Sequence, residues 1–330
     1  MNFKKIVYYL LIILLLINIF VSCKKEKQTE QFAPVVHGAV LNGPSGIGLV
    51  HLFEEKPAVE GDSTMEVCAT PDVLLPKMLK GEIDIGILPP NVAAKIFNKN
   101  NGEIVCAGVI GWGMLNLVTK DTTIKTVKDL QGKTIYSAGF GSTPEYILRY
   151  ILENNGMKIG EEKEDTKLDF SISNAEIPAA LISGKVEYAF VPEPFATVAQ
   201  IKGQGIVRAF DVQSIYKEIS GYDSYPMTMV VVRKEFAQKY PATVKMYLQS
   251  CAQSVGLVNK NPVEAGVLVE KHGLGLQAQI VNKVIPNASF AFKTAQEAKS
   301  EIENFFKVLM NFAPESIGGV LPSDDFYFNF

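Results

Sequence analysis

The chain has 330 residues, a formal net charge of −3, and a composition in which 47% of the residues are hydrophobic and 20% are charged. This length is too great for one ordinary hydrophobic core and predicts two lobes. The near-neutral charge and the lack of a basic tract argue against nucleic acid as a partner. The three histidines show no metal-ligand spacing, so we expect neither a metal nor a cofactor.

Residues 1–22 have the pattern of a targeting segment rather than of part of the fold. Lys4 and Lys5 precede an almost wholly apolar run, which is short for a membrane span and typical of a signal peptide. The run ends in Ser22-Cys23, and a small residue directly before a cysteine resembles a bacterial lipobox. We therefore expect Cys23 to carry a lipid and to become the mature N-terminus, in a flexible tether over residues 23–33. Ordinary signal-peptidase cleavage and an uncleaved anchor are the alternatives.

The rest of the chain repeats one order of elements: strand, short polar turn, helix. Expected strands lie at residues 34–42, 65–69, 83–88, 104–109, 133–138, 167–171, 188–191, 206–211 and 226–233. Expected helices lie at residues 49–54, 72–80, 92–98, 144–155, 175–182 and 195–201, and then at 234–238, 242–259, 262–272, 276–284 and 295–312. This order predicts an α/β architecture with mostly parallel sheets, helices on their faces, and a ligand crevice at the carboxyl ends of the strands.

A glycine-rich turn follows the expected strand at 133–138. Residues 139–143 (GFGST) lead to Pro144 at the first helical position, with Thr143 as the expected N-cap. A polar turn at a helix N-terminus offers free backbone N–H groups and the positive end of the helix dipole, which suit an anionic or polar ligand group. A tight connection without a ligand is the alternative on local grounds.

Residues 80–93 align without gaps with residues 183–196. In both segments a glycine ends a helix, a buried strand follows, and a proline turn begins the next helix; Asp84 aligns with Glu187 and Pro89 with Pro192. Either two strand–helix junctions are alike by chance, or the chain has two lobes of similar topology. Two such lobes would form a cleft lined by turns from both, where a small molecule would bind.

These segments resemble the solute-binding lipoproteins of bacterial ABC importers, in the group that handles nitrate, taurine, aliphatic sulfonates and thiamine-pyrimidine precursors. The resemblance covers residues 34–312 and is carried by residues 81–86 (GEIDIG), 127–135 (VKDLQGKTI), 179–187 (AALISGKVE) and Glu193-Pro194. It implies a periplasmic-binding-protein fold of type II, with a first lobe at 34–120 and 227–330 and a second lobe at 121–226. Two hinge segments, near 115–123 and 222–230, would let the lobes close on a solute.

The same resemblance implies a role and partners. A lipid-anchored monomer outside the cytoplasm would capture a small organic solute and deliver it to an ABC permease in the membrane, without hydrolytic or redox chemistry. A surface lipoprotein without a transport role is one alternative, and an enzyme on the same fold, of the menaquinone-pathway or pyrimidine-synthase type, is another. The chain lacks the G-x-S-x-G motif of hydrolases, and its signal segment argues against a cytoplasmic enzyme.

By position, the resemblance implies that turns of both lobes hold the solute. Its ligand-binding residues would be Ser45, Gly46, Thr70, Asn91 and Trp112 in the first lobe, Phe140, Ser142, Thr143, Asn174 and Glu193 in the second, and Tyr225 near the return crossing. The hydroxyl groups of Ser45, Ser142 and Thr143 suit an oxyanion, with helix capping as the alternative. Trp112 and Phe140 either stack on a flat or apolar solute or pack within the protein.

The role of Glu193 bears on which class of solute the cleft would bind. A carboxylate in the cleft would repel an oxyanion unless it caps its own helix or bonds a solute amine. The predicted turns contain no basic residue, which disfavours an inorganic anion held by Arg or Lys. A sulfonate or taurine-like solute and a thiamine-pyrimidine-like solute both stay open.

Overall fold

The computed structural model describes residues 31–55, 57, 59–137 and 140–329. The expected signal segment, Cys23 and most of the tether lie outside the described residues, as do Ala138 and Gly139 of the glycine-rich turn. Phe32–Phe330 forms one compact unit. Within the described part, every helix falls short of the length and hydrophobicity that a membrane span requires.

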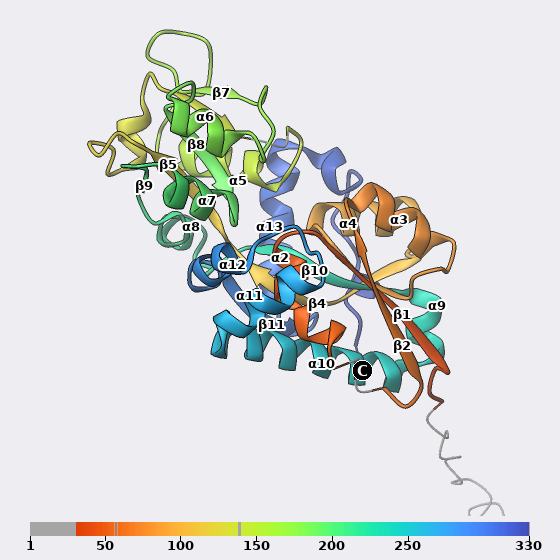
Figure 1. Ribbon diagram of the computed structural model, residues 1–330. Coiled ribbons are helices and arrows are strands. Elements are labelled where there is room, and N and C mark those ends of the chain that lie inside the picture. The colour runs from red at the N-terminus through yellow and green to blue at the C-terminus, as the bar shows by residue number, and fades with distance from the viewer. Residues whose placement is uncertain (1–30, 56, 58, 138–139, 330) are drawn as a thin grey trace, which may run out of the picture. The chain divides into compact units, whose positions relative to one another are not determined.

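Two sheets organise the described residues (Figure 1). The first has the spatial order β11 (Ser289–Thr294), β4 (Ile104–Trp112), β10 (Pro226–Arg233), β3 (Ile85–Leu88), β1 (Val35–Leu41), β2 (Asp62–Cys68). The second has the order β7 (Lys167–Asp169), β6 (Thr134–Ser137), β8 (Tyr188–Pro192), β5 (Leu115–Thr119), β9 (Val207–Arg208). β10 and β11 run against the other strands of the first sheet, and β5 runs against those of the second.

The two sheets share one topology. Five strands of the first sheet, β2-β1-β3-β10-β4, correspond in order and direction to β7-β6-β8-β5-β9 of the second. β3 and β8 therefore occupy equivalent places, as the aligned segments 80–93 and 183–196 predict. The α/β fold of two similar lobes is confirmed, and the chance interpretation of the internal repeat is not needed.

The chain crosses from the first sheet to the second at Gly113 and Met114. Both residues have positive φ angles, 63° and 75°, and Met114 is one of two residues other than glycine with this geometry in the described part. The N–H of Gly113 donates to the carbonyl of Tyr225 on the returning segment at 2.9 Å. Because β5 pairs with β8 and β9, residues 115–119, which were expected in the first lobe, belong to the second sheet. The sheet boundary thus falls before residue 115 rather than at residue 120.

Helices cover both sheets. The helices that belong with the strands of the first sheet are, in chain order, α2 (Pro44–Gly48), η1 (Val50–Phe53), α3 (Pro71–Leu79), α4 (Pro90–Lys99), α9 (Lys234–Lys239), α10 (Pro241–Lys260), α11 (Pro262–Lys271), α12 (Ala278–Val284), η3 (Ile285–Asn287), α13 (Lys299–Phe312), η4 (Pro314–Ile317) and η5 (Asp324–Phe326). Those around the second are η2 (Val127–Leu130), α5 (Thr143–Asn154), α6 (Ile177–Ser183), α7 (Phe195–Lys202) and α8 (Val212–Ser220). Many begin with a proline in the first turn, where the missing N–H is not needed by the helix.

Several expected elements differ from the structure. The expected helix at 49–54 is a 3-10 turn preceded by α2, and the expected N-cap Thr143 is wrong by one residue because Ser142 holds that position. The expected strand at 206–211 shrinks to β9, because the Asp211 carboxylate accepts from the N–H groups of Gln213 and Ser214 and so begins α8. β11 also goes unpredicted, since it forms by pairing with the distant β4.

One continuous hydrophobic core packs on the first sheet and the crossing segments and extends to β6, β8 and α5 of the second lobe. A smaller cluster lies between the second sheet and helices α6 and α7. The apolar sequence contexts of Cys68, Cys106 and Cys251 predict buried free thiols, and all three are buried and free. Burial raises the pKa of the Cys68 thiol to about 11, with the neighbouring Glu66 adding to the shift. These thiols are therefore structural rather than reactive.

Candidate functional site

The predicted ligand turns follow the carboxyl ends of parallel strands in both sheets. In the first sheet they follow β1, β2 and β3, and in the second they follow β6, β7 and β8. Trp112, expected in a turn, is instead the last residue of β4. Ligands of open α/β sheets bind at this edge, because the turns and helix N-termini there present free polar groups. The candidate site is therefore sought where turns of the two sheets meet.

The first-lobe turns differ in what their side chains offer. The buried Ser45 hydroxyl donates to the Leu41 carbonyl at 2.9 Å and accepts from the Leu41 N–H at 3.0 Å, so it closes the turn after β1. Gly46 is buried, and a Cβ there would lie 3.1 Å from the Leu41 carbonyl oxygen. Thr70, by contrast, is exposed at the N-cap position of α3 and its side chain makes no capping bond. Asn91 is half-buried near the start of α4.

Trp112 and Tyr225 lie inside the protein. Trp112 is 4% exposed, and its ring N–H donates to the Ala291 carbonyl at 2.8 Å. The Lys293 ammonium lies 5.0 Å from the centre of the Trp112 ring system. Tyr225 is fully buried against Tyr216. In this structure both aromatic rings therefore pack within the protein.

One backbone N–H group of the glycine-rich turn in the second lobe already donates a hydrogen bond within the protein. The N–H of Gly141 donates to the Glu145 carboxylate at 2.6 Å, and Glu145 also pairs with Arg149 at 2.8 Å. A side-chain carboxylate thus already lies at one of the N–H groups that were expected to attract an anion. The buried Thr143 and the half-buried Ser142 form the first turn and the N-cap position of α5.

Aromatic and amide side chains lie along the rest of the carboxyl edge of the second sheet. Phe140 is 77% exposed, and its ring meets that of Phe170 edge-to-face with 5.5 Å between centroids. Both rings follow neighbouring parallel strands, β6 and β7, so they share one edge of the sheet. The side-chain oxygen of Asn174, in the same turn as Phe170, is buried without a hydrogen-bond partner among the described residues.

Glu193 is the one carboxylate of the predicted set, and it is buried, at 1% exposure. Its carboxylate accepts from the N–H of Thr197 at 3.3 Å, which caps α7, and it forms an ion pair with the Arg208 guanidinium. Burial raises the pKa of Glu193, and the opposing charge of Arg208 limits that shift. Helix capping, one of the two roles expected for Glu193, is the one seen here.

The predicted turns themselves contain no basic residue, but Arg208 lies next to one of them, at Glu193. It ends β9, a strand whose carboxyl end was not counted among the ligand turns. The guanidinium donates to the Thr197 hydroxyl at 3.0 Å and to the Asn287 side-chain oxygen at 2.9 Å. The ends of the expected strands do not reveal Arg208, because the expected strand at 206–211 places it in the interior. Its contact with Asn287 depends on tertiary structure and has no sequence signal.

A cavity of about 400 Å³ opens beside Arg208. It is lined by Met114, Leu115, Asn116, Arg208, Phe210, Asp211, Val212, Gln213, Asn287 and Ser289. Leu115 pairs with Pro192 at the end of β8, and Ser289 pairs with Trp112 at the end of β4. The cavity therefore lies at the carboxyl edges of both sheets, where a solute held by both lobes would be expected. Its lining residues include none of the eleven residues predicted to bind the ligand.

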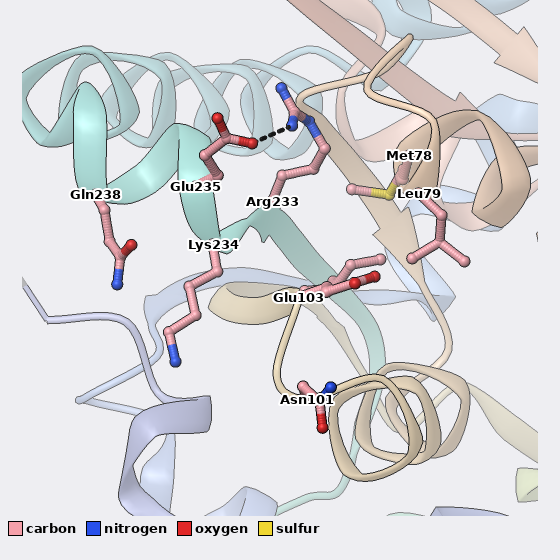
Figure 2. A pocket seen from close by; sticks show the side chains of 9 residues that line it. Met78, Leu79, Asn101, Glu103, Arg233, Lys234, Glu235 and Gln238 are labelled. Atoms are coloured by element: carbon pink, nitrogen blue, oxygen red, sulfur yellow. Dashed lines mark ion pairs between the residues drawn. The ribbon is translucent and has the colours of Figure 1, made fainter.

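A second cavity, of about 340 Å³, lies at the opposite edge of the first sheet (Figure 2). Arg233, at the end of β10, pairs there with Glu235 at 3.6 Å and with the buried Asp84 at 2.8 Å. Ile104, which also lines it, begins β4. Because β3 and β4 begin at this edge, the turns predicted to hold a ligand do not reach it. We therefore place the candidate site at the other edge.

Two lobes of one topology, joined by two crossing segments and bearing polar turns at their carboxyl edges, define a periplasmic-binding-protein-like fold. Residues 73–269 match the NMT1-like family, and the chain belongs to this family. A comparison with curated proteins gives no match.

Solved structures support the same fold. A crystal structure of an ABC transporter from Parabacteroides distasonis is 26% identical, with a TM-score of 0.77, over 90% of this chain and 99% of that one. The periplasmic aliphatic sulphonate binding protein SsuA from Escherichia coli is 17% identical, with a TM-score of 0.68, over 90% of this chain and 92% of its own. The periplasmic nitrate-binding protein NrtA from Synechocystis PCC 6803 is 14% identical, with a TM-score of 0.62, over 85% of this chain and 82% of its own.

Proposed function

We propose that this protein is the extracytoplasmic solute-binding component of an ABC importer and has no enzymatic activity of its own. It captures a small organic solute between its lobes and presents it to a membrane permease. The observation that carries this proposal is the pair of sheets with one topology, whose ligand turns and cavity lie at the carboxyl edges of both. The similarity to the ABC transporter structure from Parabacteroides distasonis supports it.

We propose that the eleven predicted residues serve the solute in two ways. Direct contact falls to the residues with accessible side chains, Thr70, Asn91, Phe140 and Ser142. It falls also to Asn174, whose side-chain oxygen has no hydrogen-bond partner among the described residues. The buried ones shape the turns that carry the first group: Ser45, Gly46, Trp112, Thr143, Glu193 and Tyr225. A sulfonate or taurine-like solute and a thiamine-pyrimidine-like solute are the two classes to be separated by experiment.

The solute is best sought by native mass spectrometry of residues 24–330, which contain the whole unit Phe32–Phe330. Thermal-shift measurements should then test taurine, alkanesulfonates, aminopyrimidines, flavins and small carboxylates. We expect a bound small molecule, or a panel member that raises the melting temperature with micromolar or tighter affinity. An empty protein that responds to no solute would favour the non-transport lipoprotein, and turnover of a bound molecule would favour the enzyme.

Phe140 gives a direct test of the proposed contact surface. Phe140→Ala should weaken a flat solute several-fold, because stacking on an exposed ring is lost, while the free energy of unfolding changes by less than about 0.5 kcal/mol. Ile201→Ala, at a residue 48% exposed on α7 in the same lobe, is the matched control and should leave the affinity unchanged. Equal affinities of the Phe140 variant and the control would remove Phe140 from the site.

The proposed lipid anchor has its own test. We propose that Cys23 carries the lipid and holds the protein on the outer side of a membrane, so Cys23→Ala should release the protein into the soluble fraction. Cys68→Ala is the control, since that thiol is buried and should not affect localisation. Retention of the Cys23 variant on membranes would contradict the lipobox interpretation.

A further inference from the structure

Arg208 joins the two sheets through its side chain. It lies on β9, which pairs with β5 in the second sheet. Its guanidinium donates at 2.9 Å to the side-chain oxygen of Asn287, which ends η3 just before β11 of the first sheet. Arg208 and Asn287 both line the cavity at the carboxyl edges of the sheets.

The guanidinium is held firmly on the side of the second sheet. Glu193 and Thr197, which bind it there, are 1% and 3% exposed. Removing Arg208 from Glu193 would leave a carboxylate buried without a counter-charge, which is strongly unfavourable. Any separation of the lobes must therefore break the bond to Asn287 before the bonds to Glu193 and Thr197.

Asn287 is oriented to receive this bond. Its side-chain N–H₂ donates to the Lys283 carbonyl in the last turn of α12 at 2.7 Å, which leaves the amide oxygen for Arg208. Asn287 is exposed, and the Arg208 side chain is 24% exposed. Water can replace either partner when they part, so the contact is reversible, unlike the buried pair behind it.

We propose that the Arg208–Asn287 contact is a releasable latch that favours the arrangement of the lobes seen here, with Glu193 and Thr197 positioning the guanidinium. Its meaning for transport rests on the proposed function: the latch would slow solute release by holding the lobes together. Its effect on lobe separation does not require a solute, so it can be measured even if no solute is found.

The test is the distance between spin labels on the two lobes, at Lys185→Cys and Lys245→Cys, in the full chain with Cys23→Ala. Both lysines are exposed, and the remaining cysteines are buried and should escape labelling. Without solute, Asn287→Ala should shift the distance distribution toward longer distances. Arg208→Lys, which alters the other partner of the latch, should also shift the distance distribution toward longer distances. One ammonium group cannot bridge Glu193, Thr197 and Asn287 as the guanidinium fork does.

Asn154→Ala is the matched control. Asn154 is an exposed asparagine on α5 of the second lobe, and its side-chain N–H₂ donates to the Tyr150 carbonyl at 2.8 Å, as that of Asn287 does to Lys283. This control should leave the distance distribution unchanged. Where a solute binds, Asn287→Ala should also raise its dissociation rate several-fold with little change in the association rate. An unchanged distribution in Asn287→Ala, or an equal shift in Asn154→Ala, would overturn the latch. Failure of every solute to bind would instead count against the proposed function.

Discussion

Two of the regions where the lobes meet have opposite character. In the first, which we call the aromatic contact, Tyr216 of α8, Tyr225 of the return crossing and Phe305 of α13 are fully buried, with 4.8 Å and 6.4 Å between successive ring centroids. The Asn304 side chain donates to the Tyr216 hydroxyl at 3.1 Å. In the second region, the Arg208–Asn287 latch is polar, partly exposed and open to a cavity.

This difference suggests that the aromatic contact acts as the hinge and the latch as the contact that opens and closes. Parting the aromatic contact would expose three large rings to water, at about 25 cal/mol for each Å² of apolar surface. Parting the latch exposes groups that water can solvate. Motion of the lobes should therefore turn about the aromatic contact, beside the crossing at Gly113 and Tyr225, and open the latch.

The largest expected effect comes from breaking the aromatic contact. Phe305→Ala should lower the free energy of unfolding by about 3–5 kcal/mol, because a buried ring is replaced by a cavity. Chemical denaturation followed by circular dichroism measures this. Tyr216→Phe keeps the ring and loses the bond to Asn304, so it should cost only about 1 kcal/mol. A cost below 1 kcal/mol for Phe305→Ala would mean that the aromatic contact is not a fixed hinge.

Breaking the ion pair behind the latch should have the next largest effect. Arg208→Ala should cost about 2–3 kcal/mol at neutral pH, less than for a fully buried pair because the side chain is partly exposed. Burial already raises the pKa of Glu193, and loss of Arg208 should raise it further. The folded variant then holds a proton that the unfolded chain has lost, so its stability should fall as the pH rises through the folded-state pKa.

Denaturation of Arg208→Ala between pH 5 and pH 8 tests this, with Glu193→Gln/Arg208→Ala as the control. The double variant lacks the titrating carboxylate, so its destabilisation should stay nearly constant with pH. A destabilisation of Arg208→Ala that grows as the pH falls would contradict the assignment of a buried, raised-pKa carboxylate.

A smaller effect is expected where α8 connects the two regions. Asp211, at the start of α8, lines the cavity and caps the helix that carries Tyr216. Asp211→Ala should cost about 1 kcal/mol, the usual effect of losing an N-cap. Bonds from Ser214 hold the pKa of Asp211 below its usual value, so this stabilisation should be present above the unfolded-state pKa and lost as the pH falls through the folded-state pKa. Asp211→Asn keeps a capping side chain and should retain most of the stability without this pH dependence.

The sequence predicted those parts of the fold that local signals determine. Proline turns and glycine stops located most helices, and the aligned segments 80–93 and 183–196 predicted the shared topology of the sheets. β11 was missed because its strand character comes from pairing with β4 far away in the chain. For the same reason the packing of Trp112 could not be predicted, because its hydrogen-bond acceptor, the Ala291 carbonyl, lies on β11.

The candidate site was predictable to a similar extent. The turns could be placed at the carboxyl edges from the order of elements, but their side-chain roles could not. The sequence pattern indicates Glu193 but not its partner Arg208, because the expected strand at 206–211 places Arg208 in its interior rather than at its end. The latch joins residues 79 positions apart, a separation that no local pattern reports.

The most direct test of the account is the distance between spin labels at residues 185 and 245, with and without the solute that native mass spectrometry identifies. A solute-binding protein of this fold should show a shorter and narrower distance distribution when the solute is bound. The shift should be reduced in Asn287→Ala and preserved in Asn154→Ala. A tightly bound solute that leaves the distribution of the unaltered chain unchanged would contradict closure of the two lobes as the basis of its function.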